Sequence, residues 1–133
     1  MIVYLDANVV IYFIEKTPVW GPKAAARIGR LSAASDQVAV SDIARLECLV
    51  GPFVTGNAVL LADFDAFFKD PGVLVFPVTA ADCERAARIR ASGRFQALDA
   101  LHLAAAVEHG CGLFLTNDVA LRRIPDLAVA ILT

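Results

Sequence analysis

The sequence has little that would anchor the chain in a membrane or cross-link it. No apolar run reaches the roughly 18 residues needed to span a bilayer. No basic region precedes the apolar residues Met1–Leu5, so we expect no signal peptide. The three cysteines, Cys48, Cys83 and Cys111, are odd in number and form no Cys-x-x-Cys pair. This argues against a disulfide framework or a thiolate metal site, and predicts buried free thiols in a cytoplasmic protein.

The sequence also lacks a strong charge of either sign. The formal net charge is −2, from 12 basic and 14 acidic residues, which alone argues weakly against nucleic acid as a partner. If four of the acids form one metal site, however, the rest of the chain carries 12 basic against 10 acidic residues. Bound cations would then reverse the local field where a phosphate must lie. A nucleic-acid substrate is therefore not excluded.

Apolar residues are abundant, at 58% of the chain, and they are arranged in short runs between helical patterns. Continuous apolar runs of this length are typical of strands buried on both faces of a parallel sheet. The runs that predict strands are Ile2–Leu5, Val38–Val40, Val73–Val78, Leu113–Leu115 and, as a last edge strand, Val129–Leu132. The sequence has no repeat and no linker. We therefore expect one α/β domain over residues 1–133, with helices on both faces of a parallel sheet.

The segments between these runs carry helix signals. Thr79 and Asp82 form a pattern similar to a capping box, which predicts a helix that continues through Ser92. The Ala- and Leu-rich segment Ala97–His109 ends before Gly110, a residue suited to terminate a helix. Apolar residues at helical spacing predict two further helices, around Ala24, Ile28 and Leu31 and around Leu60, Phe64 and Phe67.

Four carboxylates are placed where they can meet at the carboxyl edge of such a sheet. Asp6 directly follows the first strand, and Asp118 follows the strand that begins at Leu113. Ser41 follows the second strand and could cap the next helix. Glu47 lies six residues later, about 9 Å along that helix, and helical side chains lean back toward the N-terminus. Asp99 lies near the start of a crossover helix, which begins at the same edge. All four acids are therefore candidates for one site.

Clustered carboxylates are unfavourable unless something compensates their charge. Two of them 4 Å apart repel by about 4 kcal/mol at an effective dielectric near 20. All-oxygen ligands suit Mg²⁺ or Mn²⁺, and such ions can activate water and orient a phosphodiester. The neighbouring polar residues that could orient the ligands are Asn8, Ser41, Thr116 and Asn117. Each acid alone is more typical of a helix cap or turn, and it is their joint placement that favours a metal site.

Four short motifs resemble those of the PIN-domain family, and within it the small bacterial VapC-type toxins of toxin–antitoxin pairs. Val3-Tyr4-Leu5-Asp6-Ala7-Asn8 is similar to the first acidic motif of the family, and Ser41-Asp42-Ile43-Ala44-Arg45-Leu46-Glu47 to its second. Leu98-Asp99-Ala100-Leu101-His102-Leu103-Ala104 resembles the third, and Leu115-Thr116-Asn117-Asp118 the last. Each motif is weak alone, but their order and spacing cover essentially the whole chain.

The resemblance implies a three-layer α/β/α fold with a five-stranded parallel sheet. It also implies Mg²⁺ or Mn²⁺ as cofactor, endoribonuclease activity in which Asp6, Glu47, Asp99 and Asp118 are catalytic, dimerisation, and inhibition by a cognate antitoxin. Two other interpretations stay open. A haloacid-dehalogenase-like phosphatase also has an Asp after its first strand, although its second acid is replaced here by Asn8 and no Lys follows Lys69. A PIN-like scaffold that does not cleave RNA is the second.

Several further residues are interpreted more plainly. His102 follows Asp99 by one helical turn and is expected to be a packed or hydrogen-bonded helix residue, because the four acids already account for a hard-metal site. Basic residues that could hold RNA phosphates, or simply face solvent, are Lys23, Arg27 and Arg30 in one helix and Arg85 and Arg88 in another. The apolar segments Val10–Ile14 and Leu60–Phe68 are expected to supply both core and a groove for a partner helix.

Overall fold

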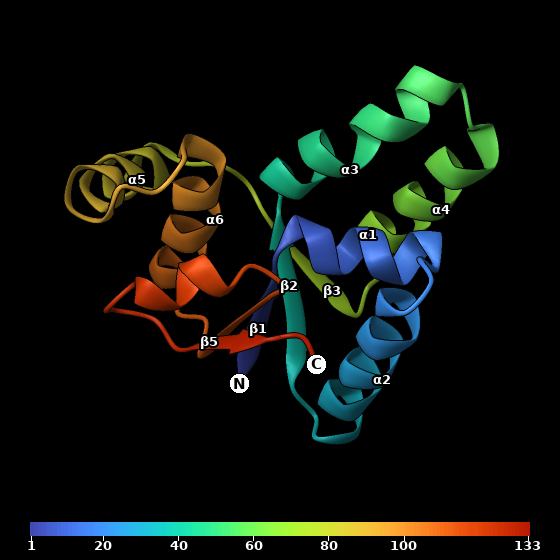
Figure 1. The fold of residues 1–133 in the computed structure, drawn as a ribbon, viewed down its shortest axis with the longest axis horizontal. Coiled ribbons are helices and arrows are strands. Elements are labelled where there is room, and N and C mark those ends of the chain that lie inside the picture. Colours follow the sequence, from blue (N-terminus) through green and yellow to red (C-terminus); the bar gives the residue numbers. More distant parts are fainter.

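The structure, a computed structural model, describes residues 1–133, and its five strands form one parallel sheet (Figure 1). The strands are β1 (Ile2–Leu5), β2 (Gln37–Ser41), β3 (Val73–Phe76), β4 (Leu113–Thr116) and β5 (Val129–Ile131). The helices are α1 (Ala7–Glu15), α2 (Trp20–Ala33), α3 (Asp42–Thr55), α4 (Ala58–Lys69), α5 (Ala80–Gly93), α6 (Ala97–Glu108) and the short 3-10 helix η1 (Val119–Arg123).

The strand order places β1 in the middle of the parallel sheet. Successive strands are added first on one side of β1 and then on the other, so the order reverses between β1 and β4. The order is β3-β2-β1-β4-β5, so the chain builds outward from β1 to one edge and then returns to build the other. Leu5 pairs with Leu115 at the ends of β1 and β4. In open parallel sheets the crevice beyond such a reversal point is where ligands bind. The fold therefore positions the residues after β1 and β4 next to one another at that crevice.

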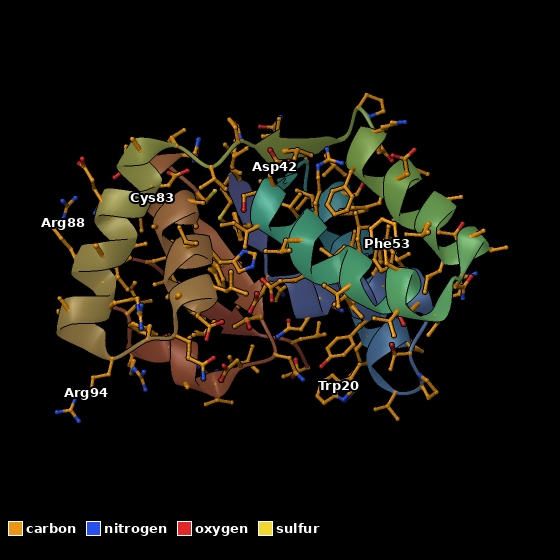
Figure 2. The ribbon with its side chains drawn as sticks, turned by 90° about the horizontal axis from the view of Figure 1, so that it is seen from above. Trp20, Asp42, Phe53, Cys83, Arg88 and Arg94 are labelled. Carbon is orange, nitrogen blue, oxygen red and sulfur yellow. The ribbon has the colours of Figure 1, made fainter.

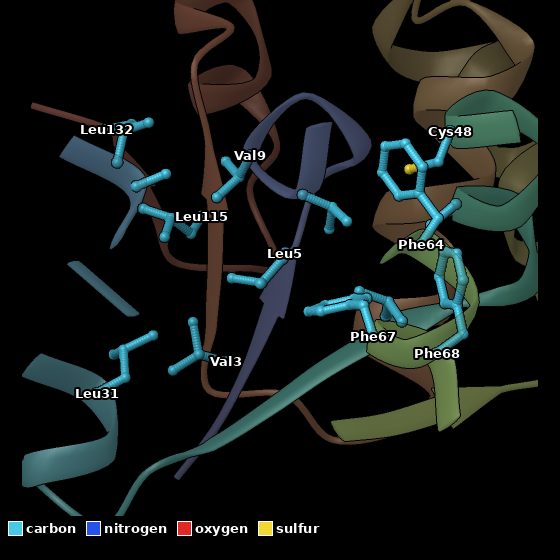
Figure 3. Packing of buried hydrophobic residues seen from close by; sticks show 14 residues of the cluster. Val3, Leu5, Val9, Leu31, Cys48, Phe64, Phe67, Phe68, Leu115 and Leu132 are labelled. Carbon is cyan, nitrogen blue, oxygen red and sulfur yellow. The ribbon is translucent and has the colours of Figure 1, made fainter. Parts of the chain in front are cut away.

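Alternation along the strands divides the core into two apolar clusters, one on each face of the sheet. Val3 and Leu5 belong to a cluster with α1, α2, α3 and α4, in which Phe64 and Phe67 of α4 are buried (Figure 3). Tyr4, between them, points to the other face and packs with α5, α6 and η1. The sheet thus lies between two helical layers (Figure 1). The three-layer fold and the five-stranded parallel sheet expected from the resemblance are confirmed.

The five expected strands and the helices between them are present, with small differences at their ends. β3 ends at Phe76, one residue before Pro77, because proline cannot donate to the next ladder position. The capping box at Thr79 is formed, with Thr79 and Asp82 each accepting the backbone N–H of the other at 3.1 Å. The helix that it opens extends one residue beyond the expectation, to Gly93. Gly110 adopts a φ of 69°, a left-handed conformation, just beyond the end of α6.

One expectation about a single side chain was wrong. Cys83 is exposed on α5, whereas Cys48 and Cys111 are buried as expected, and all three thiols are free. The segments Val10–Ile14 and Leu60–Phe68 mostly pack on the core, as expected, and Phe13, Ile14 and Phe67 also line a cavity of about 390 Å³ between α1 and α4. A partner helix in this groove stays a prediction. Within the fold, no helix combines the length and the apolar character that a membrane crossing requires.

Candidate active site

Asp6 is held at the junction between β1 and α1. It occupies the N-cap of α1, where its Oδ1 accepts the backbone N–H of Ala7 at 2.8 Å. Its Oδ2 accepts the hydroxyl of Thr116 at 2.7 Å. The residue is only 6% exposed, and this burial raises the pKa of the carboxyl above its usual value, although these hydrogen bonds oppose the shift. Asp6 is therefore both a helix cap and a buried acid at the reversal point of the sheet.

Asp118 lies on the adjacent strand end and is linked to Asp6 through one side chain. It is the N-cap of η1, and its Oδ1 accepts the backbone N–H of Ala120 at 3.0 Å. Its own backbone N–H donates to Oγ1 of Thr116 at 3.0 Å. Thr116 thus bonds to both acids, and it fixes the end of β4 relative to the end of β1.

Glu47 reaches the same edge from α3, on the opposite side of β1. Its Oε1 is 2.5 Å from Nε2 of His102 on α6, and its side chain is 31% exposed. The same His102 nitrogen is 3.9 Å from Oδ1 of Asp6. The histidine ring therefore lies between two of the candidate acids.

Asp99, in the first turn of α6, is close enough to the other acids to respond to their charges. Burial is the largest cause that raises the pKa of this carboxyl. The negative charges of Asp6 and Asp118 raise it further, and Glu47 adds a smaller effect of the same sign. The structure thus brings side chains from four separate elements into one electrostatic neighbourhood.

The donor chemistry of this edge fits a hard divalent cation. The structure contains no group of three or more Asp, Glu, His or Cys side chains placed to hold a metal ion by themselves. Mg²⁺ does not require one, because it usually keeps several waters and is bound through one or two carboxylates. The pKa values of Asp6 and Asp99 are raised by burial and by like charges, and a bound cation would relieve both effects. Oxygen donors of this kind suit Mg²⁺ or Mn²⁺.

The four supporting residues take different positions. Thr116 bonds to Asp6 directly, as described above. Asn8 contacts the end of β4, through Oγ1 of Thr116 at 3.5 Å and the backbone N–H of Asn117 at 3.4 Å. Asn117 donates its side-chain N–H to the hydroxyl of Tyr12 at 3.1 Å. The contacts of Asn8 and Asn117 hold the end of β4 against α1, and of these residues only Thr116 bonds to a carboxylate of the site.

Ser41 was expected as a helix cap and as a neighbour of the acids, and the cap expectation was wrong. It occupies the N-cap position of α3, but its side chain makes no capping hydrogen bond. Instead its Oγ lies 2.7 Å from the hydroxyl of Tyr4, and both side chains are fully buried. The reason is the alternation of β2, which points Ser41 toward the α6 layer, where Tyr4 also points.

The sequence interpretation missed the contacts that His102 makes. The residue is indeed buried and hydrogen-bonded in α6, as expected, but its partners are Glu47 and Tyr4. The signal that could have found this was the one-turn spacing from Asp99, together with Tyr4 two residues before Asp6. Nothing in the sequence shows that Tyr4 and His102 are in contact, because the contact depends on how α6 packs against β1.

Comparison with known proteins agrees with this architecture. Residues 3–127 match the PIN domain family. The chain belongs to that family, which confirms the resemblance to PIN domains seen in the four motifs. No curated protein matches the chain in sequence.

Solved structures share the fold at low sequence identity. VapBC2 from Rickettsia felis, bound to a DNA fragment from the promoter, has a chain with 21% identity and a TM-score of 0.79, with 98% of each chain covered. A toxin–antitoxin complex from Klebsiella pneumoniae has 20% identity and a TM-score of 0.71, with 96% of this chain and 95% of the other covered. VapC20 from Mycobacterium tuberculosis, a toxin that cleaves the sarcin–ricin loop, has 19% identity and a TM-score of 0.67, with 84% and 86% covered.

The raised pKa of Asp99 predicts the effect of Asp99→Asn on stability. An acid whose pKa is raised by folding binds more protons in the native than in the unfolded state, between the ordinary value near 3.8 and the raised value. In chelator, the stability contributed by this group therefore falls as the pH rises through that range and is level above it. We expect Asp99→Asn to reduce this fall and to raise the melting temperature at neutral pH by roughly 1–3 °C, a small gain because solvent screens a half-buried site.

The control is Asp42→Asn, which removes an acid that pairs with Arg45 at 2.8 Å on the surface of α3. That pair is worth little, so the melting temperature should stay the same or fall slightly. Thermal unfolding in EDTA from pH 3.5 to 8 measures both variants. A drop of several degrees in Asp99→Asn would instead make Asp99 a structural residue.

Proposed function

We propose that this PIN-domain protein is a metal-dependent endoribonuclease, the toxin of a toxin–antitoxin pair, formed by one nuclease domain over residues 1–133. The observation that carries the proposal is the convergence of Asp6, Glu47, Asp99 and Asp118 from four elements on the reversal point of the sheet. Burial and mutual repulsion oppose this arrangement, as the raised pKa values of Asp6 and Asp99 show. A fold that keeps such a cluster is well suited to bind cations.

In this proposal Asp6, Glu47, Asp99 and Asp118 hold Mg²⁺ or Mn²⁺. The bound ion supplies a lowered pKa for an attacking water and positive charge beside the phosphodiester. Thr116 orients Asp6 and fixes the backbone of Asp118, so two of the acids keep their positions while substrate binds. Hydrolysis then breaks a phosphorus–oxygen bond of the RNA chain, with the oxygen of water added to phosphorus.

Arginines grouped on α5 and η1 support a polyanionic substrate. Six of the 12 basic residues lie on α5, just after it, or on η1: Arg85, Arg88, Arg90, Arg94, Arg122 and Arg123. Asp118 is the N-cap of η1, so Arg122 and Arg123 belong to the short helix that this acid begins. Figure 2 shows Arg88 on α5 and Arg94 just after it, at the opposite end of the view from Phe53 of α3.

Part of this group of arginines lines a cavity of about 450 Å³ between α5 and η1. Arg123 is fixed there, because its guanidinium stacks over Phe95 at 4.4 Å and donates to the carbonyl oxygen of Arg94 at 3.1 Å. Arg88 lines the same cavity, whereas the charge of Arg85 is matched by Glu108. Lys23 of the other basic stripe is held over the ring of Trp20 on α2 at 4.7 Å, and it does not line this cavity. We therefore assign RNA phosphates to Arg88 and Arg123.

Two other functions fit the site less well. A dehalogenase-like phosphatase needs a second acid two residues after Asp6, where Asn8 instead braces the end of β4. A scaffold that does not cleave RNA has no need to keep four mutually repelling acids. The phosphatase alone would turn over a small phosphate monoester, and the scaffold would turn over neither substrate.

Cleavage should require both the metal and the acids. We expect Asp6→Asn and Asp99→Asn to reduce RNA cleavage at least a hundredfold, because each removes a ligand charge from the ion that activates water. Asp42→Asn, an acid on the surface of α3, should cleave at the wild-type rate. The assay follows a labelled RNA in Mg²⁺, in Mn²⁺ and in excess EDTA. Undiminished cleavage in EDTA would contradict the metal-dependent reaction.

The arginine assignment predicts a change in RNA affinity and in its salt dependence. In an Asp6→Asn background, which prevents cleavage, Arg88→Gln with Arg123→Gln should weaken binding to single-stranded RNA. Each lost phosphate contact lowers the slope of log K against log salt by about 0.7, so the double variant should lose roughly 1.4. The control is Lys23→Gln with Arg30→Gln on α2. Equal losses in the two double variants would show that the α5–η1 cavity is not the RNA site.

We also propose an antitoxin and a second copy of the chain as partners in the cytoplasm. The Rickettsia felis and Klebsiella pneumoniae structures are complexes of toxin with antitoxin, which supports the first partner. The chain itself shows an apolar strip on α3, formed by Leu46, Val50 and Phe53, each more than half exposed. Exposed apolar strips on soluble proteins commonly mark protein interfaces.

These partners predict the behaviour of the purified protein. Alone, the chain should form dimers by light scattering. Expressed from its own operon, it should co-purify in fixed ratio with a small neighbour-encoded protein, and the complex should cleave RNA at least tenfold more slowly. A monomer that captures no such protein would refute the proposed partners and leave the nuclease proposal standing.

A further inference from the structure

A chain of buried side chains runs from the core to the candidate acid on α3. Oγ of Ser41 lies 2.7 Å from the hydroxyl of Tyr4, which lies 2.6 Å from Nδ1 of His102. Nε2 of the same imidazole is 2.5 Å from Oε1 of Glu47. Ser41 and Tyr4 are fully buried and His102 is 1% exposed, so no water competes for these hydrogen bonds.

The direction of each hydrogen bond follows from the chemistry of the groups. An ionised Glu47 can only accept, so Nε2 of His102 must carry a hydrogen and donate it. In the neutral imidazole Nδ1 is then an acceptor, and the hydroxyl of Tyr4 must donate to it. A phenol keeps its hydrogen at neutral pH, so the buried hydroxyl of Tyr4 has one to donate. With its one hydrogen given to His102, Tyr4 can only accept from Ser41.

The rings in this chain are also fixed by packing. Tyr4 stacks on Phe114 with ring centres 5.2 Å apart and planes 9° from parallel, and it meets His102 edge to face at 5.6 Å. Both ring nitrogens of His102 are occupied by their partners, so neither is free to bind a metal. Glu47, by contrast, is a long and flexible side chain on the surface of α3, and nothing else in the structure restrains its carboxylate as closely.

We propose that His102, supported by Tyr4 and Ser41, is a positioning residue that holds the carboxylate of Glu47 in place for the divalent cation. This inference rests on the proposed function. One oxygen of Glu47 accepts from His102, and the other, Oε2, would remain available as a ligand for the ion. A glutamate held in this way has already lost most of its rotamer freedom on folding. Ion binding therefore does not have to order the side chain, and the entropy loss on binding is smaller than for a free glutamate. The hydrogen bond also joins α3 and α6, which lie on opposite faces of the sheet.

The test compares variants at position 102 that keep or remove the donor. His102→Leu fills a similar volume without a donor, whereas His102→Gln places an amide N–H close to the position of Nε2. Mn²⁺ affinity, measured by calorimetry without RNA, should fall about tenfold or more in His102→Leu, as for other partners of metal ligands, and should be largely restored in His102→Gln. Tyr4→Phe should lower it by a smaller factor, because the ring of His102 loses the hydrogen bond that holds its Nδ1. His109→Gln, at the far end of α6, is the matched control and should bind as wild type.

A second measurement needs no metal. The ¹⁵N shifts of the imidazole in the metal-free protein should show the hydrogen of His102 on Nε2, where Glu47 accepts it. Wild-type Mn²⁺ affinity in a folded His102→Leu would overturn the inference and leave the nuclease proposal intact, as would a hydrogen found on Nδ1 alone. If His102→Leu does not fold, Tyr4→Phe decides: a lowered Mn²⁺ affinity supports the inference, and wild-type affinity contradicts it. A wild-type protein that binds no Mn²⁺ would defeat both this inference and the proposed function.

Discussion

Like-charged carboxylates held together at a partly buried edge are the constraint on which the rest of this structure depends. Asp6 and Asp99 have pKa values raised by burial first, and charges of other acids add to the shift. The fold offsets this cost with contacts that are local to each acid. Asp6 caps α1 and accepts from Thr116, and Asp118 caps η1. The capping and clustering roles, which are alternatives for any single acid, are therefore combined in the same side chains.

The topology explains why acids from distant parts of the chain lie at one edge of the sheet. β1 lies between β2 and β4, so the residue after β1 has the start of α3 on one side and the start of η1 on the other. Glu47 comes from the first of these segments and Asp118 from the second. Asp99 arrives from the first turn of α6, which packs on the opposite face from α3. A parallel sheet with this strand order thus collects acids that are more than 100 residues apart in sequence.

Much of this architecture could be predicted from the sequence, because burial on two faces leaves a strong pattern. The apolar runs at Ile2–Leu5 and Leu113–Leu115 predict β1 and β4 almost to the residue. The positions of the acids follow from the strand ends, since the carboxyl ends of parallel strands share one edge. The family resemblance adds the number of strands, which periodicity alone does not give.

What could not be predicted depends on which side chains face one another across the fold. Ser41 looks like a helix cap in sequence, but the pleat of β2 directs it to Tyr4. His102 looks like an ordinary helix residue, and only the packing of α6 on β1 brings it between Glu47 and Asp6. The exposed strip on α3 has the same origin. Its apolar residues look like a core face until the structure shows that no element covers them.

The central claim, that the acids at this edge form one cation site, is tested most directly by anomalous diffraction. Crystals of the protein soaked in Mn²⁺ and measured at the manganese absorption edge locate the ion without any assumption about activity. The account predicts an anomalous peak within about 2.5 Å of oxygens from at least two of Asp6, Glu47, Asp99 and Asp118, which is lost in crystals of Asp6→Asn. A peak bound elsewhere, or no peak at an ion concentration that supports cleavage, would contradict it.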